Sequence, residues 1–246
     1  MTKSRSLDKA TIPHDADVVV GQRLAKKQAT SEPRQPRAAQ QTRSRKTSRA
    51  LLDAGFDILT EEGLNGLTVP EVSRRAGVSV GTVYRRFGDK EGLLTALVAE
   101  FTSAFRDEMH ATMRVDRIPA HALPSAVVAV AVRAIVGWYR KNERLLRVFV
   151  PLGQGDPATF HQGSQVSQEG RIMFRDLLWP THSLISHSDP ERALDVAYRL
   201  VYAACMHRVL NGPNLESPTE FTWDDLADEL IRTASLLLFG ALPQGA

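Results

Sequence analysis

The chain contains 246 residues, of which 43% are hydrophobic and 24% are charged, and its formal net charge is +3. This length and composition support a sizeable hydrophobic core and more than one domain of average size. No apolar run approaches the roughly 20 residues of a membrane span, and the only cysteine, Cys205, excludes a disulfide framework. Because the N-terminus also lacks an apolar signal core, we expect the protein in the reducing cytoplasm, with no membrane partner.

The positive charge is concentrated near the N-terminus. Residues 1–50 contain 12 lysines and arginines and 4 acidic residues, a balance of +8, so the remaining residues carry −5. Residues 1–41 are poor in aromatic residues and rich in Gln, Ser and Arg, and we predict that they form a disordered basic arm. Two interpretations stay open: arginines here, including Arg43 and Arg45 just beyond the arm, lie near DNA phosphates, or the arm only keeps the chain soluble.

Two helices are predicted before residue 77. Apolar residues at helical spacing predict a first helix that ends at Gly63: Leu52, Phe56 and Leu59. Thr68 and Glu71 predict a capping box at the start of a second helix, in which each side chain accepts the backbone N–H of the other. Gly77 then ends this helix, and Ser79 is placed to cap the next one. A three-residue turn of this kind joins two helices at a steep angle.

The third helix, residues 79–87, carries the features that suggest a function. Its buried side is defined by Val83 and Phe87, at about 100° per residue. The residues predicted to point outward are small, hydroxyl-bearing or basic: Gly81, Thr82 and Arg85, with Tyr84 and Arg86 on the flanks. Val80 is left open, because its angle is near the core but a first-turn residue can also reach a DNA groove or a thymine methyl group.

This pattern predicts a helix-turn-helix whose second helix enters the major groove of DNA. The outward side chains can donate to phosphates or base edges, and no acidic residue interrupts them between Gly77 and Gly88. The alternative is a helical hairpin with a solvated charged face, since short turns between helices are common.

A long helix is expected to follow. Asp89 is its predicted N-cap, and Lys90 lies in its first turn, where a cation opposes the helix dipole. That conflict is more easily understood if Lys90 faces a phosphate. Apolar residues then continue at helical spacing and extend the helix to about Met113: Leu94, Val98, Phe101 and Phe105.

The segment at residues 44–105 resembles the N-terminal DNA-binding domain of the TetR (tetracycline-repressor type) family of transcriptional regulators. The words that carry the resemblance are AGVS, GTVY, a following Phe87, and KEGLL from Lys90. The resemblance implies that Thr82 contacts DNA backbone or base, that Tyr84 and Lys90 contact phosphate, and that Gly81 and Arg85 lie at base edges. Two positions depart from the family. Family members often have a polar or basic residue at the position of Val80 and a histidine at the position of Arg86.

The residues predicted to contact DNA are therefore ten: Arg43, Arg45, Thr68, Val80, Gly81, Thr82, Tyr84, Arg85, Arg86 and Lys90. The DNA-binding domain is expected at residues 42–105, and a helical domain for ligand binding and dimerisation at residues 106–246. The predicted fold class is all-α.

The second domain is expected to consist of helices alone. Caps and apolar spacing predict helices at residues 124–141, 142–149, about 166–179, 190–210 and 222–239, with a loop at residues 151–157. Family resemblance implies that the last two helices form a homodimer through a four-helix bundle. Small and apolar residues agree with this: Ala197, Val201, Ala204, Cys205, Leu226, Leu230, Leu237 and Leu238. The same residues are equally explained as core of a single chain.

Bulky side chains in the middle helices are candidates to line a cavity for a small-molecule effector: Trp138, Phe149, Met173, Phe174 and Trp179, with His207 as a polar group. Each is also explained as core packing. The sequence contains no phosphate-binding loop, dinucleotide fingerprint, zinc-protease motif or nucleophile elbow, so we predict no enzyme, cofactor or metal site.

These observations predict a homodimeric regulator, most simply a repressor that a small molecule releases from a palindromic operator. A DNA-coating architectural protein and a helical small-molecule carrier remain as alternatives.

Overall fold

The computed structural model describes residues 37–119, 121–214, 219 and 221–240, and over these residues it contains α-helices and two short 3-10 helices without strands. The α-helices are α1 (Arg37–Gly66), α2 (Val69–Ala76), α3 (Val80–Phe87), α4 (Lys90–Thr112), α5 (Pro124–Lys141), α6 (Glu143–Gly155), α7 (Pro157–Leu178), α8 (Pro190–Asn211) and α9 (Trp223–Phe239). The 3-10 helices are η1 (Val115–Arg117) and η2 (Trp179–Leu184). The predicted all-α class is confirmed.

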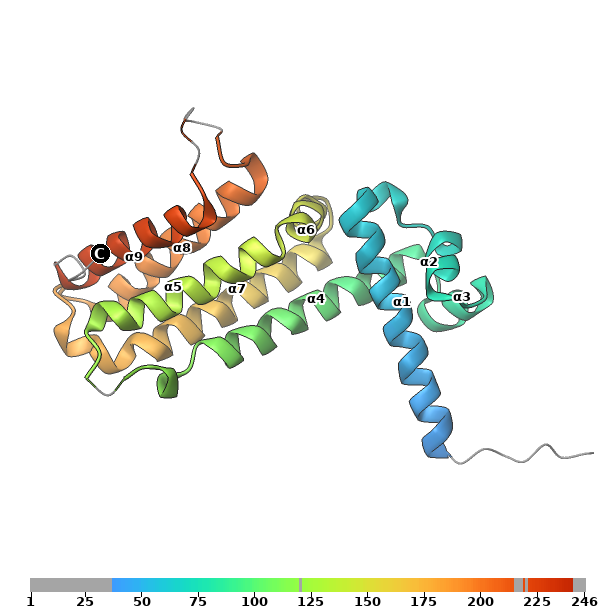
Figure 1. The fold of residues 1–246 in the computed structure, drawn as a ribbon, viewed down its shortest axis with the longest axis horizontal. Helices are drawn as coiled ribbons and strands as arrows, with labels where there is room; N and C mark the ends of the chain where they lie inside the picture. Colours follow the sequence, from blue (N-terminus) through green and yellow to red (C-terminus); the bar gives the residue numbers. More distant parts are fainter. Residues whose placement is uncertain (1–36, 120, 215–218, 220, 241–246) are drawn as a thin grey trace, which may run out of the picture.

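The molecule has two parts joined by one long helix (Figure 1). Helices α1, α2 and α3 form one end, and α5 to α9 form the body, in which α5 packs against α8 and α9. Helix α4 starts beside α3 and runs along α7, and α1 also contacts α6. The buried side of α4 continues without a break from Leu93 to Met109. A single apolar stripe therefore packs against both parts, and the predicted domain boundary at residue 105 falls inside this helix.

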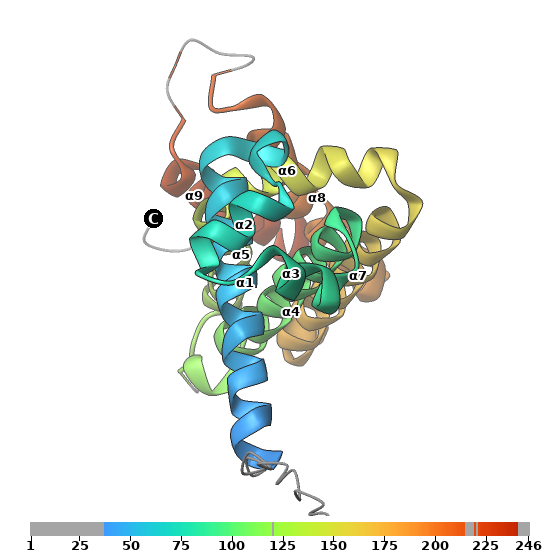
Figure 2. The same ribbon diagram turned by 90° about the vertical axis from the view of Figure 1, so that its right-hand side faces the viewer.

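Helix α1 differs from the prediction at its start. It begins at Arg37, so residues 37–41 are helical although they were assigned to the disordered arm; residues 1–36 lie outside the described residues. Its first turns project beyond the rest of the molecule (Figures 1 and 2). The predicted end is confirmed at Gly63, whose φ of 69° breaks the helical backbone three residues before the helix element ends.

The predicted loop at residues 151–157 is wrong, because α6 continues through Pro151 to Gly155. A proline inside a helix removes one backbone hydrogen bond, and tertiary packing compensates for it here. Leu146, Phe149 and Gly153 are buried as α6 packs against α7. A Cβ added at Gly153 would lie 3.6 Å from the backbone of Phe160, so the two helices approach closely.

The last two helices begin and end as predicted. Asp189 accepts a hydrogen bond from the backbone of Arg192 at 3.0 Å, and Thr222 and Asp225 form the expected capping box. Five of the eight residues proposed for a dimer contact are buried in the chain's own core: Ala197, Val201, Cys205, Leu230 and Leu238. The other three, Ala204, Leu226 and Leu237, are half-buried and pack against that core. Burial raises the pKa of the Cys205 thiol to about 12, so this group stays protonated at neutral pH. None of the described helices is long and apolar enough to cross a membrane.

Candidate nucleic-acid interface

Helices α2 and α3 form the predicted helix-turn-helix. Gly77 adopts a left-handed conformation, with φ of 65°, and its N–H donates to the carbonyl of Arg74. The next residue, Val78, donates to the carbonyl of Ser73 at 3.0 Å. Glycine takes this conformation without a steric penalty, which is why a chain can turn so abruptly here. Val72 and Val83 are both fully buried, so the two helices share one core.

The outward face of α3 is a continuous strip of four exposed residues: Val80, Gly81, Tyr84 and Arg85. The side chains of Val80 and Tyr84 are 40% and 52% exposed, and Gly81 and Arg85 are exposed beside them. Val83 lies on the opposite, fully buried side. Val80, whose position was left open, is therefore partly covered by the domain and partly open to solvent. Figure 2, viewed toward this end of the molecule, shows α3 at the front.

The hydroxyl of Thr82 is already engaged within the chain. It shares a hydrogen bond with the hydroxyl of Ser79 at 2.9 Å and accepts one from the guanidinium of Arg85 at 3.4 Å. Ser79 occupies the N-cap position of α3, but its side chain does not form the cap bond that the sequence suggested. Arg85 itself is exposed, so its guanidinium is a cationic donor at one edge of the strip.

Arg86 is held inside the domain. Its guanidinium donates to the hydroxyl of Ser44 at 3.0 Å and to that of Ser48, both on α1. These bonds join the third helix to the projecting part of the first. The partners lie about 40 residues earlier in the chain, so a pattern read within one helix could not find them.

The remaining residues predicted to contact DNA lie on α1, at the start of α2 and at the start of α4. Lys90 is half-buried, and its ammonium donates to the carbonyl of Leu64 at 3.5 Å. Thr68 accepts from the backbone N–H of Glu71 at 3.3 Å. Arg43 and Arg45 are exposed on the projecting turns of α1.

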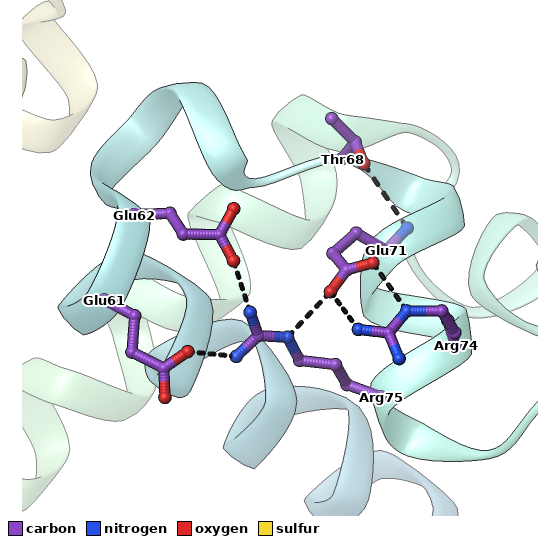
Figure 3. A network of polar contacts seen from close by, with 6 residues as sticks. All are labelled: Glu61, Glu62, Thr68, Glu71, Arg74 and Arg75. Carbon is purple, nitrogen blue, oxygen red and sulfur yellow. Dashed lines mark hydrogen bonds and ion pairs between the residues drawn. The ribbon is translucent and has the colours of Figure 1, made fainter.

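The second half of the capping box at α2 is wrong, because the Glu71 carboxylate takes other partners (Figure 3). It accepts from Arg74 at 2.5 and 2.8 Å and from Arg75 at 2.8 Å. Arg75 also donates to Glu61, at 2.5 Å, and to Glu62, both near the end of α1. The hydrogen bonds from the two guanidiniums lower the pKa of Glu71 to about 2. This network ties α2 to α1 behind the exposed face.

The predicted effector residues differ in burial: Trp138, Phe149 and Phe174 are buried, whereas Trp179 and His207 are exposed. Trp138 and Phe149 both pack on Phe101, with ring centroids 5.4 and 5.0 Å from it. Phe174 is fully buried against Tyr198, 5.8 Å between centroids, and Met173 beside it is half-buried. Trp179 lies on η2, is 43% exposed and stacks on His182, and His207 is exposed on α8.

Ion pairs and close packing that the sequence did not indicate hold α4 against the body. Arg106 on α4 pairs with Glu169 on α7, and Glu108 pairs with Lys141 on α5 at 2.6 Å. A Cβ added at Gly170 would meet the ring of Phe105 at 3.1 Å and the hydroxyl of Tyr198 at 2.8 Å. A glycine is therefore needed where α4, α7 and α8 meet.

Comparison with known proteins agrees with this geometry. Residues 51–97 match the family model of bacterial regulatory proteins of the tetR family. The chain is 39% identical over 89 residues to the HTH-type transcriptional regulator BetI of Klebsiella pneumoniae (strain 342), and 38% identical to that of Escherichia coli (strain UTI89 / UPEC). Each match covers 36% of this chain and 42% of the relative, so the chain matches less than half the length of these proteins.

Solved structures extend the likeness to the body. A TetR transcription regulator from Haloarcula marismortui superimposes with a TM-score of 0.61 at 18% identity, covering 81% of this chain and all of the other. Salmonella enterica GusR superimposes with a TM-score of 0.58 at 16% identity, covering 78% and 95%. At such identities the likeness establishes the fold. The arrangement of a helix-turn-helix end and a helical body is that of TetR regulators.

Proposed function

We propose that the protein is a sequence-specific DNA-binding transcriptional regulator of the TetR family, because residues 51–97 match the family model of bacterial regulatory proteins of the tetR family. The observation that carries the proposal is the exposed strip on α3, in which Tyr84 and Arg85 stand free of the core beside the open surface of Gly81. A recognition helix contacts base edges with such a face.

The proposed DNA contacts fall into three groups. Val80, Gly81 and Arg85 lie at the base edges, Thr82 contacts base or backbone, and Tyr84 contacts phosphate. Arg43, Arg45, Thr68 and Lys90 face phosphates, which would increase affinity for every sequence. Arg86 acts from behind, because its bonds to Ser44 and Ser48 fix the projecting part of α1 beside α3.

We place the homodimer contact on the outer faces of α8 and α9. Exposed residues follow one face of α8 at helical spacing: Val196, Leu200, Ala203, His207 and Leu210, all apolar but the histidine, and Leu236 is exposed on α9. Burying such a face against its two-fold copy removes apolar area from water. A dimer would present two α3 helices to successive major grooves about 34–36 Å apart, which matches a palindromic operator.

A small-molecule effector would act through α4. Its body half is held by Arg106, Glu108 and Phe105, and its first turn adjoins α3. A ligand that favours another packing of the body would tilt α4, change the separation of the two α3 helices and release the operator. Coupling energies of about 1–3 kcal/mol change affinity 5–150-fold, which is sufficient for a repressor.

Selection of bound duplexes from a random pool at fixed salt tests the proposal. We expect one palindromic motif with half-sites about one helical turn apart. The Arg85→Ala variant should enrich a degenerate motif under the same conditions. Binding without any enriched motif would contradict operator recognition and favour a DNA-coating protein. Effectors can then be sought as compounds that weaken binding to this operator and raise the thermal stability of the body.

A further inference from the structure

The first turn of α3 offers DNA an apolar surface. Val80 is 40% exposed, although valine is usually buried. Its side chain carries no group that could form a hydrogen bond with DNA. Gly81 follows, and a Cβ built there would meet nothing within 4 Å, so the adjacent surface is open to close approach. Thr82 completes the turn with a hydroxyl that Ser79 and Arg85 already engage.

The helix geometry places this apolar surface beside the polar one. At about 100° per residue, Val80, Tyr84, Gly81 and Arg85 follow one another around an arc of about 140°, and Val83 lies outside this arc. Val80 stands at one edge of the arc and Arg85 at the other. Because residues at the N-terminal end of a recognition helix reach base edges, the methyl groups of Val80 would be brought to the floor of the major groove.

Only one base presents an apolar group there. Thymine carries a 5-methyl group in the major groove, whereas the other bases present donors and acceptors that a valine would desolvate without replacing their hydrogen bonds. We infer that Val80 is a specificity-determining residue that packs against a thymine methyl group, so that each operator half-site requires a T·A pair at one position. This inference rests on the proposed operator recognition and adds the base class that one residue reads.

Deoxyuridine substitution tests the contact, because it removes the methyl group and leaves every hydrogen-bonding group of the base pair in place. The operator recovered by selection is remade with each thymine replaced singly, and the dissociation constant is measured at fixed salt. For the wild-type chain we expect one position in each half-site at which the change weakens binding about fourfold, and about fifteenfold when both half-sites are changed, as burial of one methyl group predicts.

The variant Val80→Ala should bind the thymine operator more weakly and should lose the sensitivity to deoxyuridine at that position. Alanine is a better helix former than valine, so α3 is expected to remain folded, which thermal unfolding would check. Val115→Ala is the matched control, because Val115 is 60% exposed on η1, outside the helix-turn-helix. It should leave both affinity and deoxyuridine sensitivity unchanged.

Two failures can be told apart. An enriched operator whose affinity is unchanged by every deoxyuridine, or whose sensitivity is the same in Val80→Ala, would overturn the role of Val80 and leave operator recognition standing. A wild-type chain that enriches no sequence would overturn operator recognition itself, and the inference about Val80 with it.

Discussion

Large side chains of α3 and the aromatic residues inside the helical body differ in exposure. On α3, Tyr84 and Arg85 are exposed although they lie next to the buried Val83. In the body, Trp138, Phe149 and Phe174 are buried and pack on other aromatic rings. A short, capped helix can present side chains to a partner because its neighbours already bury its other face. Aromatic residues of a helical layer are mostly used to fill it, and sequence position alone does not separate a cavity wall from core.

The largest expected effect is a loss of stability on removing a buried ring from the body. Phe174→Ala removes a fully buried ring that packs on Tyr198, and it should lower the free energy of unfolding by about 3–5 kcal/mol. Chemical denaturation followed by circular dichroism measures this. Phe160→Ala is the matched control, because Phe160 is 63% exposed on the same helix and should change stability little. A stable Phe174→Ala variant that had lost effector response would instead make Phe174 a ligand contact.

At the DNA-binding end, the corresponding change should spare stability. Arg85→Ala removes an exposed guanidinium, so unfolding should be unaffected while discrimination between the operator and an altered half-site falls by about 1–3 kcal/mol. Competition binding with a series of single base changes measures the loss. Equal weakening on every sequence would show that Arg85 contacts phosphate and not a base.

A change at the neighbouring Arg86 should lower stability as well as DNA affinity. Arg86→Ala leaves Ser44 and Ser48 without their shared donor, and we expect a loss of about 1–2 kcal/mol in stability. Binding should weaken on all sequences, with the base preference retained. Arg85→Ala serves as the control for loss of one positive charge on α3. If Arg86→Ala relaxed base preference without destabilising the domain, Arg86 would be a DNA contact after all.

The smallest effect concerns the network behind α2. The pKa of Glu71 is lowered from 4.5 to about 2, so its ionised form stabilises the fold above about pH 4.5 and this contribution is lost as the pH falls toward 2. The stability difference between the wild type and Glu71→Gln should therefore shrink over this range. Glu91→Gln, in the first turn of α4, is the control. A constant difference across the range would show that the network does not stabilise the domain, as is common for exposed ion pairs.

The sequence by itself determined the features that depend on neighbours within a few residues. The start of α4 at Asp89, the turn at Gly77 and the capping box at Thr222 and Asp225 were all predictable, because caps and apolar spacing act within one or two turns of helix. The helix-turn-helix is built from such signals, and the family resemblance rests on the same short words.

Only the tertiary structure decided what depends on distant partners. It left Val80 40% exposed, where its angle alone was ambiguous, and joined Arg86 to serines about 40 residues away. It kept α6 helical through Pro151, and it buried Ala197, Val201 and Cys205 in the chain's own core. In each case the outcome depends on which helix packs against which, and the free energy of that packing exceeds the local preference of a single residue.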